Sequence, residues 1–173
     1  MNIALVVGHS KESQGAVNMS LGMTEFQYNE ELVHTVACNL LNTQHKALVF
    51  YRNRYRDLPF EINAKSPDLI LSFHCNAYNT RVSGTEALYY HTSSIGQEIA
   101  TELSLKLSQL LEIPNRGAKP KTAEDRGGYL LKYTVAPCVI LEPFFIDNTS
   151  DLQKGLYKLS DIADEIADFL HKL

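Results

Sequence analysis

The sequence lacks any apolar run of the ~18–20 residues that a membrane-crossing helix requires, so no transmembrane segment is expected. It also lacks a basic, secretory-type leader: residues 2–7 are apolar, and the chain turns polar at Gly8 and His9. This start predicts a short buried strand and no signal peptide. We therefore expect the protein to be cytoplasmic when it is synthesised.

Cysteine is scarce, and the cysteines are widely spaced along the sequence. The three cysteines, Cys38, Cys75 and Cys138, are odd in number and form no Cys-x-x-Cys pair. This spacing argues against a disulfide framework and against a thiolate zinc cluster. We expect free thiols in a protein that is made in a reducing compartment.

An excess of positive charge is also missing. Lys and Arg number 16 against 20 Asp and Glu, which gives a net charge of −4. A nucleic-acid-binding protein would need a dense cationic surface, so no nucleic-acid partner is expected. The 173 residues, 45% of them apolar, suffice for one domain with a substantial core, which we expect to span residues 1–173.

Strand and helix patterns alternate along the chain. Apolar or β-rich runs of strand length lie at residues 2–7, 47–51, 69–73, 84–90 and 137–141. Between them lie helical patterns, and a last helix carries Ile162, Ala163, Ile166 and Leu170 on one face. The alternation predicts an α/β fold: a single domain with a mostly parallel, twisted central sheet flanked by helices on both faces.

Two helix starts carry the sequence pattern of a capping box. Thr24 and Gln27 form the first, and Ser94 and Gln97 form the second, which opens a helix with Ile95 on its apolar face. The first helix is expected to bury residues spaced by three and four positions: Phe26, Val33, Val36, Ala37, Leu40 and Leu41.

Histidines and carboxylates follow the strands that are predicted most clearly. His9 comes after the first strand, His74 directly after residues 69–73, and Glu142 directly after residues 137–141. Glu25 lies in the opening turn of the first helix. Ligands of such sheets bind beyond the carboxyl ends of the strands, where these four side chains would converge. Each of these residues alone is also typical of a solvated loop. Glu25 is in addition favoured in the first turn of a helix by the helix dipole.

Two imidazoles and one carboxylate are a recurrent ligand set for catalytic zinc, which lowers the pKa of a bound water to about 7. A second carboxylate outside the ligand set can take a proton from the water and pass it to a leaving amine. With His9, Glu25 and His74 as ligands and Glu142 as the base, the pattern specifies metal-assisted hydrolysis of an amide.

Five motifs together carry a resemblance to a known family. The sequence resembles the zinc-dependent N-acetylmuramoyl-L-alanine amidases, and within them the catalytic domains of phage endolysins. The motifs are Val-Gly-His at 7–9, Gly-Met-Thr-Glu-Phe-Gln-Tyr-Asn at 22–29, Ser-Phe-His-Cys-Asn-Ala at 72–77, Gly-Thr-Glu-Ala-Leu-Tyr-Tyr at 84–90 and Leu-Glu-Pro-Phe-Phe-Ile-Asp-Asn at 141–148.

The resemblance implies Zn²⁺ held by His9, Glu25 and His74, with Glu142 as the catalytic acid and base. It implies peptidoglycan as the substrate, cleaved at the amide between the lactyl group of N-acetylmuramic acid and L-alanine of the stem peptide. An endolysin of this kind accumulates in the host cytoplasm and acts on the cell wall after release.

Two further positions match motifs of the resembling family and are candidate substrate contacts. Asn76 either contacts the substrate or stabilises a turn. Arg116 either contacts acidic groups of the stem peptide or belongs to a solvated basic edge. Asn29 is expected to support the site.

Two other functions remain open at this point. The first is a zinc peptidase that cuts another bond of the stem peptide. The second is a catalytically silent, amidase-like module that binds the wall, although all four candidate positions are intact.

Overall fold

A six-stranded sheet forms the centre of the computed structural model, which describes residues 1–41 and 43–173. Its middle strands are the apolar runs, because both of their faces are covered and alternate side chains enter opposite cores. In spatial order the strands are β4 (Lys46–Tyr51), β1 (Asn2–Val7), β5 (Leu69–Phe73), β8 (Cys138–Glu142), β6 (Thr85–Tyr90) and β7 (Asn115–Lys121).

The direction of each strand decides which strand ends lie at the same edge of the sheet. Strands β4, β1, β5 and β8 are parallel, whereas β6 runs antiparallel to β8 and parallel to β7. The expected mostly parallel sheet is confirmed. The carboxyl ends of β1, β5 and β8 share one edge of the sheet, and the reversed β6 begins at that same edge.

The strand ends are in close register at this edge. Val7 pairs with Phe73, and Phe73 pairs with Leu141. The pairing continues one step beyond the strands, where the Gly8 amide donates to the Phe73 carbonyl and the His74 amide donates to the Leu141 carbonyl, both at 2.9 Å. Residues that follow the strands are therefore held by backbone hydrogen bonds.

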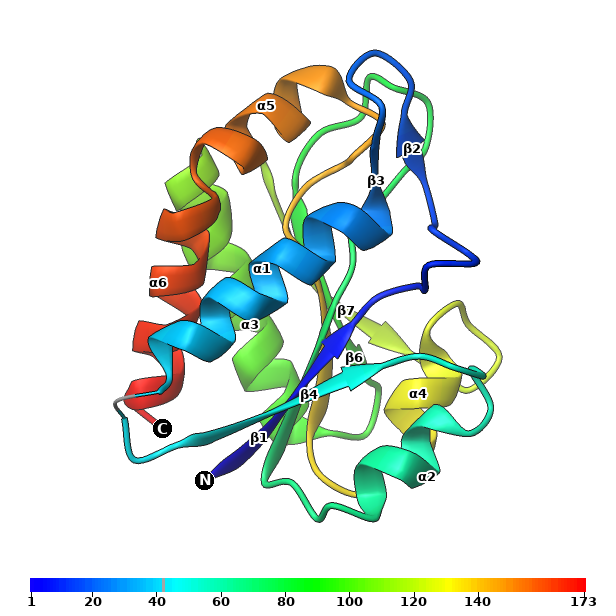
Figure 1. The fold of residues 1–173 in the computed structure, drawn as a ribbon, viewed down its shortest axis with the longest axis vertical. Coiled ribbons are helices and arrows are strands. Elements are labelled where there is room, and N and C mark those ends of the chain that lie inside the picture. Colours follow the sequence, from blue (N-terminus) through cyan, green and yellow to red (C-terminus); the bar gives the residue numbers. More distant parts are fainter. Residues whose placement is uncertain (42) are drawn as a thin grey trace.

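Helices cover both faces of the sheet, as expected (Figure 1). One face carries α1 (Glu25–Asn39), α3 (Ser94–Leu111), α5 (Thr149–Tyr157) and α6 (Leu159–His171), and the other carries α2 (Leu58–Asn63) and α4 (Gly128–Tyr133). The side chains of β1 divide between the two cores: Ile3, Leu5 and Val7 face the larger, and Ala4 and Val6 the smaller. Across residues 1–41 and 43–173, no helix has the length and apolar character needed to span a membrane.

The predicted capping box at the start of α1 is confirmed. The Thr24 hydroxyl accepts from the Gln27 amide at 3.2 Å, and the Gln27 side chain accepts from the Thr24 amide at 3.0 Å. These bonds satisfy amides that have no partner within the helix. They also fix Glu25 as the first residue of the helix.

Other local expectations were wrong. The N-cap of α3 is Ser93, not Ser94, and its hydroxyl accepts from the Gly96 amide at 3.0 Å. Ile95, expected on the apolar face of this helix, is exposed. Leu41 is also exposed: α1 ends at Asn39, and the buried apolar face ends with its C-cap residue, Leu40.

Three short elements had not been expected. Strands β2 (Val17–Asn18) and β3 (Met23–Thr24) pair in an antiparallel ladder that is too short to have a sequence period. Helix α5 has a recognisable start, since the Asn148 side chain accepts from the Ser150 and Asp151 amides.

The packing of α5 on the core predicts an unusual response at Gly155. A Cβ at this position would lie 2.6 Å from Cζ of the buried Phe144 ring. Alanine normally stabilises a helix interior over glycine by about 1 kcal/mol, but overpacking costs ~1–3 kcal/mol. We expect Gly155→Ala to lower the free energy of unfolding by up to about 2 kcal/mol in urea denaturation. Ser160→Ala, an exposed helix change in α6, is the control and should stay within about 0.5 kcal/mol. A more stable Gly155→Ala variant would contradict this packing.

Candidate active site

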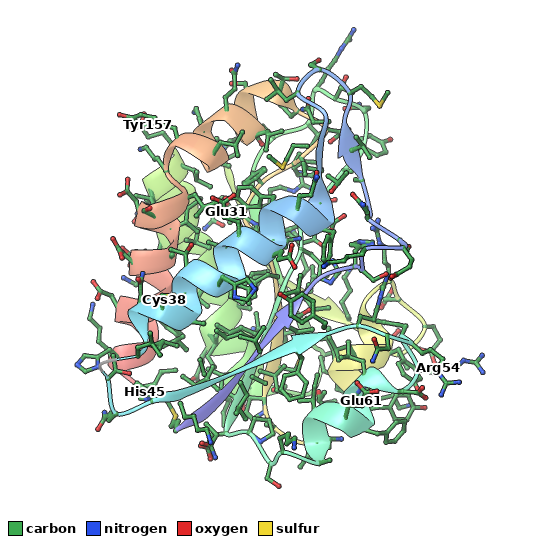
Figure 2. The ribbon with its side chains drawn as sticks, in the orientation of Figure 1. Glu31, Cys38, His45, Arg54, Glu61 and Tyr157 are labelled. Carbon is green, nitrogen blue, oxygen red and sulfur yellow. The ribbon has the colours of Figure 1, made fainter. Side chains whose placement is uncertain are left out.

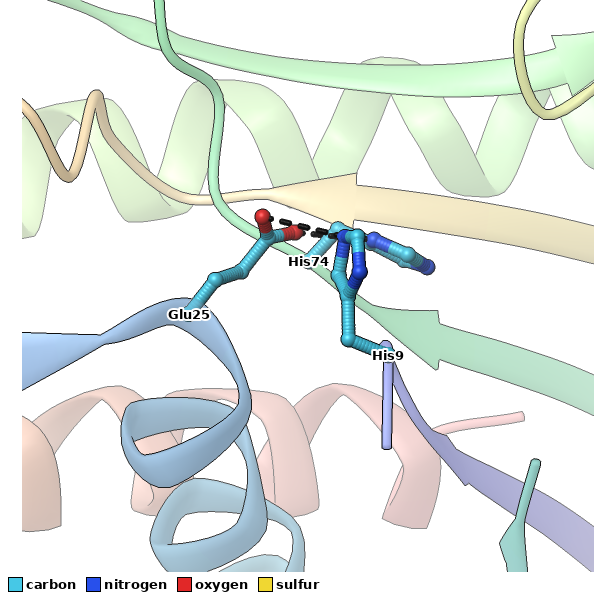
Figure 3. A group of neighbouring side chains, drawn as sticks. All are labelled: His9, Glu25 and His74. Atoms are coloured by element: carbon cyan, nitrogen blue, oxygen red, sulfur yellow. Dashed lines mark hydrogen bonds and ion pairs between the residues drawn. The ribbon is translucent and has the colours of Figure 1, made fainter. Parts of the chain in front are cut away.

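His9, Glu25 and His74 meet at the sheet edge where β1 and β5 end (Figure 3). His9 lies in the loop after β1, His74 follows β5 directly, and Glu25 opens α1. One potential ligand atom of each residue lies within 4.8 Å of those of the other two. The sheet thus brings together residues that are up to 65 positions apart, from His9 to His74.

The Glu25 carboxylate is the centre of this cluster and is fully buried. Its Oε1 lies 2.9 Å from His74 Nδ1 and accepts from the Cys75 amide at 3.1 Å. Its Oε2 lies 3.1 Å from His9 Nε2 and accepts from the Ala16 amide at 3.2 Å. Burial alone raises the pKa of Glu25, but the hydrogen bonds and charges of His74 and His9 outweigh it, and the pKa falls well below 4.5. Glu25 is therefore an ionised carboxylate.

The backbone around the cluster is tightly constrained. His9 has a φ of 68°, a left-handed conformation that is uncommon for residues other than glycine. Gly15 also has a positive φ, and a Cβ there would lie 2.6 Å from Glu25 Oε2 and 2.7 Å from His9 Cδ2. A Cβ at Gly8 would collide with the Phe73 carbonyl. Gly15 was missed from the sequence, where a single glycine in a loop carries no specific signal.

The donor set fits a zinc ion. Both ring nitrogens of His9 are buried: Nε2 has only the Glu25 carboxylate beside it, at 3.1 Å, and Nδ1 has no hydrogen-bond partner within the described residues. A buried ring nitrogen without a hydrogen-bond partner destabilises the fold, and a bound metal ion would supply the missing partner. Imidazole nitrogen and carboxylate oxygen are ligands that Zn²⁺ accepts, and three of them leave one position open.

Glu142 ends β8 and lines a cavity of about 310 Å³ together with His9 and His74. Burial, followed by the charges of Glu86 and Glu25, raises the pKa of Glu142 to about 7. The two carboxylates of the site thus differ in state: Glu25 stays ionised, while Glu142 can gain or lose a proton near neutral pH.

Glu86 is a site residue that the sequence analysis did not single out. It pairs with Glu142 in the antiparallel register of β6 and β8, so both side chains lie on one face of the sheet. Glu86 Oε1 accepts from Asn76 Nδ2 at 2.8 Å, and Oε2 accepts from Arg116 Nε at 2.7 Å. Its only sequence signal is its position within the motif at residues 84–90.

Asn76 and Arg116, the candidate substrate contacts, are both engaged within the fold. Besides its bond to Glu86, Asn76 accepts from the Ala77 amide at 2.9 Å through Oδ1. The Arg116 guanidinium lies 5.1 Å from the centre of the Phe145 ring. Neither residue lines the cavity beside Glu142. A substrate contact by either stays a prediction, and the bonds favour the alternative of a supporting role.

Cys75 and Asn29 lie behind the cluster. Both are buried, and the Cys75 thiol donates to Asn29 Oδ1 at 3.7 Å. Burial, together with the charges of Glu25 and Glu142, raises the pKa of the Cys75 thiol well above 9. This thiol is held protonated and is unsuited to act as a nucleophile. The supporting role expected of Asn29 stays a prediction.

Comparisons with known proteins agree on one family. The N-acetylmuramoyl-L-alanine amidase family matches residues 3–172. The amidase LytC of Bacillus subtilis is 27% identical over 175 residues, which cover 95% of this chain and 33% of LytC. The chain thus spans about one third of the length of this relative.

Two solved structures of similar fold are an endolysin catalytic domain and an N-acetylmuramoyl-L-alanine amidase. The catalytic domain of the CD27L endolysin, which targets Clostridia difficile, is 30% identical with a TM-score of 0.83, covering 97% of this chain and 95% of that domain. An N-acetylmuramoyl-L-alanine amidase from Clostridium difficile 630 has a TM-score of 0.88 at 18% identity, covering 96% and 92% of the two chains, and supports the fold alone. With nearly its whole length matched, this chain belongs to the N-acetylmuramoyl-L-alanine amidase family.

Proposed function

We propose that the chain is a zinc-dependent peptidoglycan amidase that hydrolyses the bond between N-acetylmuramic acid and L-alanine of the stem peptide. The observation that carries the proposal is the His9–Glu25–His74 cluster, two of whose members, His9 and His74, line one cavity with Glu142. Membership of the amidase family supports the bond that is cleaved.

His9, Glu25 and His74 would hold the ion, and Gly8 and Gly15 leave the room that their side chains need. Zn²⁺ bound there would supply a lowered pKa for a water molecule and polarisation of the substrate carbonyl. The Cys75 and Ala16 amides hold the Glu25 carboxylate in place, so that the ligand set is formed before a substrate arrives.

Glu142 is the proposed acid and base. In its ionised form the carboxylate takes a proton from the attacking water, and in its protonated form it donates that proton to the leaving L-alanine nitrogen. A pKa near 7 suits both steps, because neither form is rare at neutral pH. The neighbouring Glu86 contributes to this pKa by its negative charge.

We further propose that the chain is the catalytic domain, over residues 1–173, of an endolysin that is made in the cytoplasm and reaches the wall after release. The similarity to the CD27L endolysin catalytic domain supports this origin. The proposed partner is peptidoglycan, in the form of a muramoyl peptide.

The first test concerns the metal. We expect about one zinc per chain, and His74→Ala should lose both the zinc and the activity because a ligand is removed. Metal content is measured by mass spectrometry, and activity by digestion of purified cell wall with detection of released peptides that begin with L-alanine.

His91→Ala, which removes an exposed histidine, is the control and should keep both properties. A chelator should abolish wall hydrolysis and Zn²⁺ should restore it. Hydrolysis that survives the chelator would contradict a metal-dependent site, and new amino termini other than L-alanine would indicate a peptidase.

Glu142→Gln separates acid–base chemistry from metal binding. We expect the variant to keep its zinc while kcat falls by roughly 10²–10⁴-fold, because a carboxamide cannot carry the proton. Glu98→Gln, an exposed change on α3, should leave kcat unaltered. Loss of zinc in Glu142→Gln would show that the two glutamates had been assigned the wrong way round.

The raised pKa of Glu142 also predicts how stability depends on pH in the metal-free protein. In an unfolded chain Glu142 ionises near 4.5, whereas in the folded protein it does so near 7, so the wild type loses stability as the pH rises between these values. Glu142→Gln cannot lose a proton. Relative to wild type, we expect it to gain up to about 3 kcal/mol between pH 4 and pH 8.

Urea denaturation of both proteins at the two pH values measures this gain. A difference between the proteins that is equal at pH 4 and pH 8 would contradict the burial of an ionisable Glu142.

A further inference from the structure

The cavity that holds the proposed reacting groups is also lined by basic residues. Besides His9, His74 and Glu142, its lining includes Arg52, Arg126 and Tyr55. Arg52 follows β4, and Arg126 precedes α4, so two segments far apart in sequence each bring a guanidinium group to the same space. None of the functions assigned above uses either arginine.

Arg52 and Arg126 differ from Arg54 and Arg116 in that no carboxylate within the described residues forms an ion pair with them. By contrast, Arg54 points away from the fold (Figure 2) and pairs with Asp57 at 2.6 Å. Arg116 pairs with Glu86.

The acidic residue closest in sequence, Asp125, forms no ion pair with either arginine within the described residues. Asp125 also lines the cavity, but its Oδ2 accepts from the amide and the hydroxyl of Thr122, at 2.7 and 3.0 Å. The Arg52 guanidinium lies 5.8 Å from the centre of the Tyr55 ring, which holds it against an aromatic wall. The cavity therefore has two guanidinium groups that are not ion-paired within the described residues, and such planar groups with several N–H donors can bind a carboxylate.

We infer that Arg52 and Arg126 form a subsite for a free carboxylate on the peptide part of the substrate. This inference rests on the proposed function. In a muramoyl peptide the lactyl carboxyl is already used in the scissile amide, so the free carboxylates of the glycan–peptide unit lie on the peptide. Because the arginines share one small cavity with Glu142, the carboxylate must lie close to the scissile bond, on the residue that follows L-alanine. The preferred substrates would carry D-isoglutamate at that position, not its amide D-isoglutamine.

Two muramoyl tripeptides that differ only in this carboxylate or carboxamide test the subsite. We expect the wild type to favour the carboxylate substrate, and Arg126→Gln and Arg52→Gln each to raise its KM about tenfold, as loss of a charge-assisted hydrogen bond would. The kcat should stay within about twofold, and the KM for the carboxamide substrate should not change. Arg54→Gln, in the same loop as Arg52 but already ion-paired, is the matched control and should not alter either KM.

A second measurement is independent of turnover. Calorimetric titration with L-alanyl-D-isoglutamate and with L-alanyl-D-isoglutamine should give tighter binding of the former to wild type, and no preference in Arg126→Gln. Equal binding of both dipeptides to wild type, or an equal rise in KM for both substrates in the variants, would overturn the subsite. If the wild type hydrolyses neither tripeptide nor cell wall, the proposed function fails, while the binding preference still decides the subsite.

Discussion

The buried carboxylate of Glu25 is the constraint on which the rest of the site depends. A buried carboxylate is costly unless every oxygen has a partner, and here two imidazoles and two backbone amides provide them. The capping box of α1 places this residue at the first helical position, and Gly15 leaves room beside its Oε2. The start of α1 and the geometry of the site are therefore coupled: a change that moves the start of α1 also moves a proposed metal ligand.

The sheet gives two glutamates different electrostatic roles at the same edge. Glu25 is surrounded by donors and stays ionised, whereas Glu142 ends a buried strand, faces Glu86 across the β6–β8 ladder and has a pKa near 7. The antiparallel direction of β6 is responsible, because it brings its first residues to the edge where the parallel strands end. A fixed anion beside a group that exchanges protons suits metal-assisted hydrolysis.

The hydrogen bonds of Asn76 and Arg116 explain why motif residues need not contact a substrate. Both side chains bind Glu86 and thereby hold a carboxylate next to Glu142. The arginines that do line the cavity, Arg52 and Arg126, lie outside the motifs that carry the family resemblance. Within this site, the residues of the motifs form the proposed reacting centre and its support, while the proposed carboxylate subsite lies outside the motifs.

The sequence by itself determined the layered α/β fold and the capping box at Thr24, because both depend on local periodicity. It also determined that His9, His74 and Glu142 follow strands, and parallel strands end at one edge of a sheet. Only the tertiary structure placed Glu86 opposite Glu142 and brought Arg52 and Arg126 to one cavity. Asn76 lies 10 residues before its partner Glu86, and Arg52 and Arg126, which line one cavity, are 74 residues apart. No local pattern encodes the direction of β6 or the meeting of two loops.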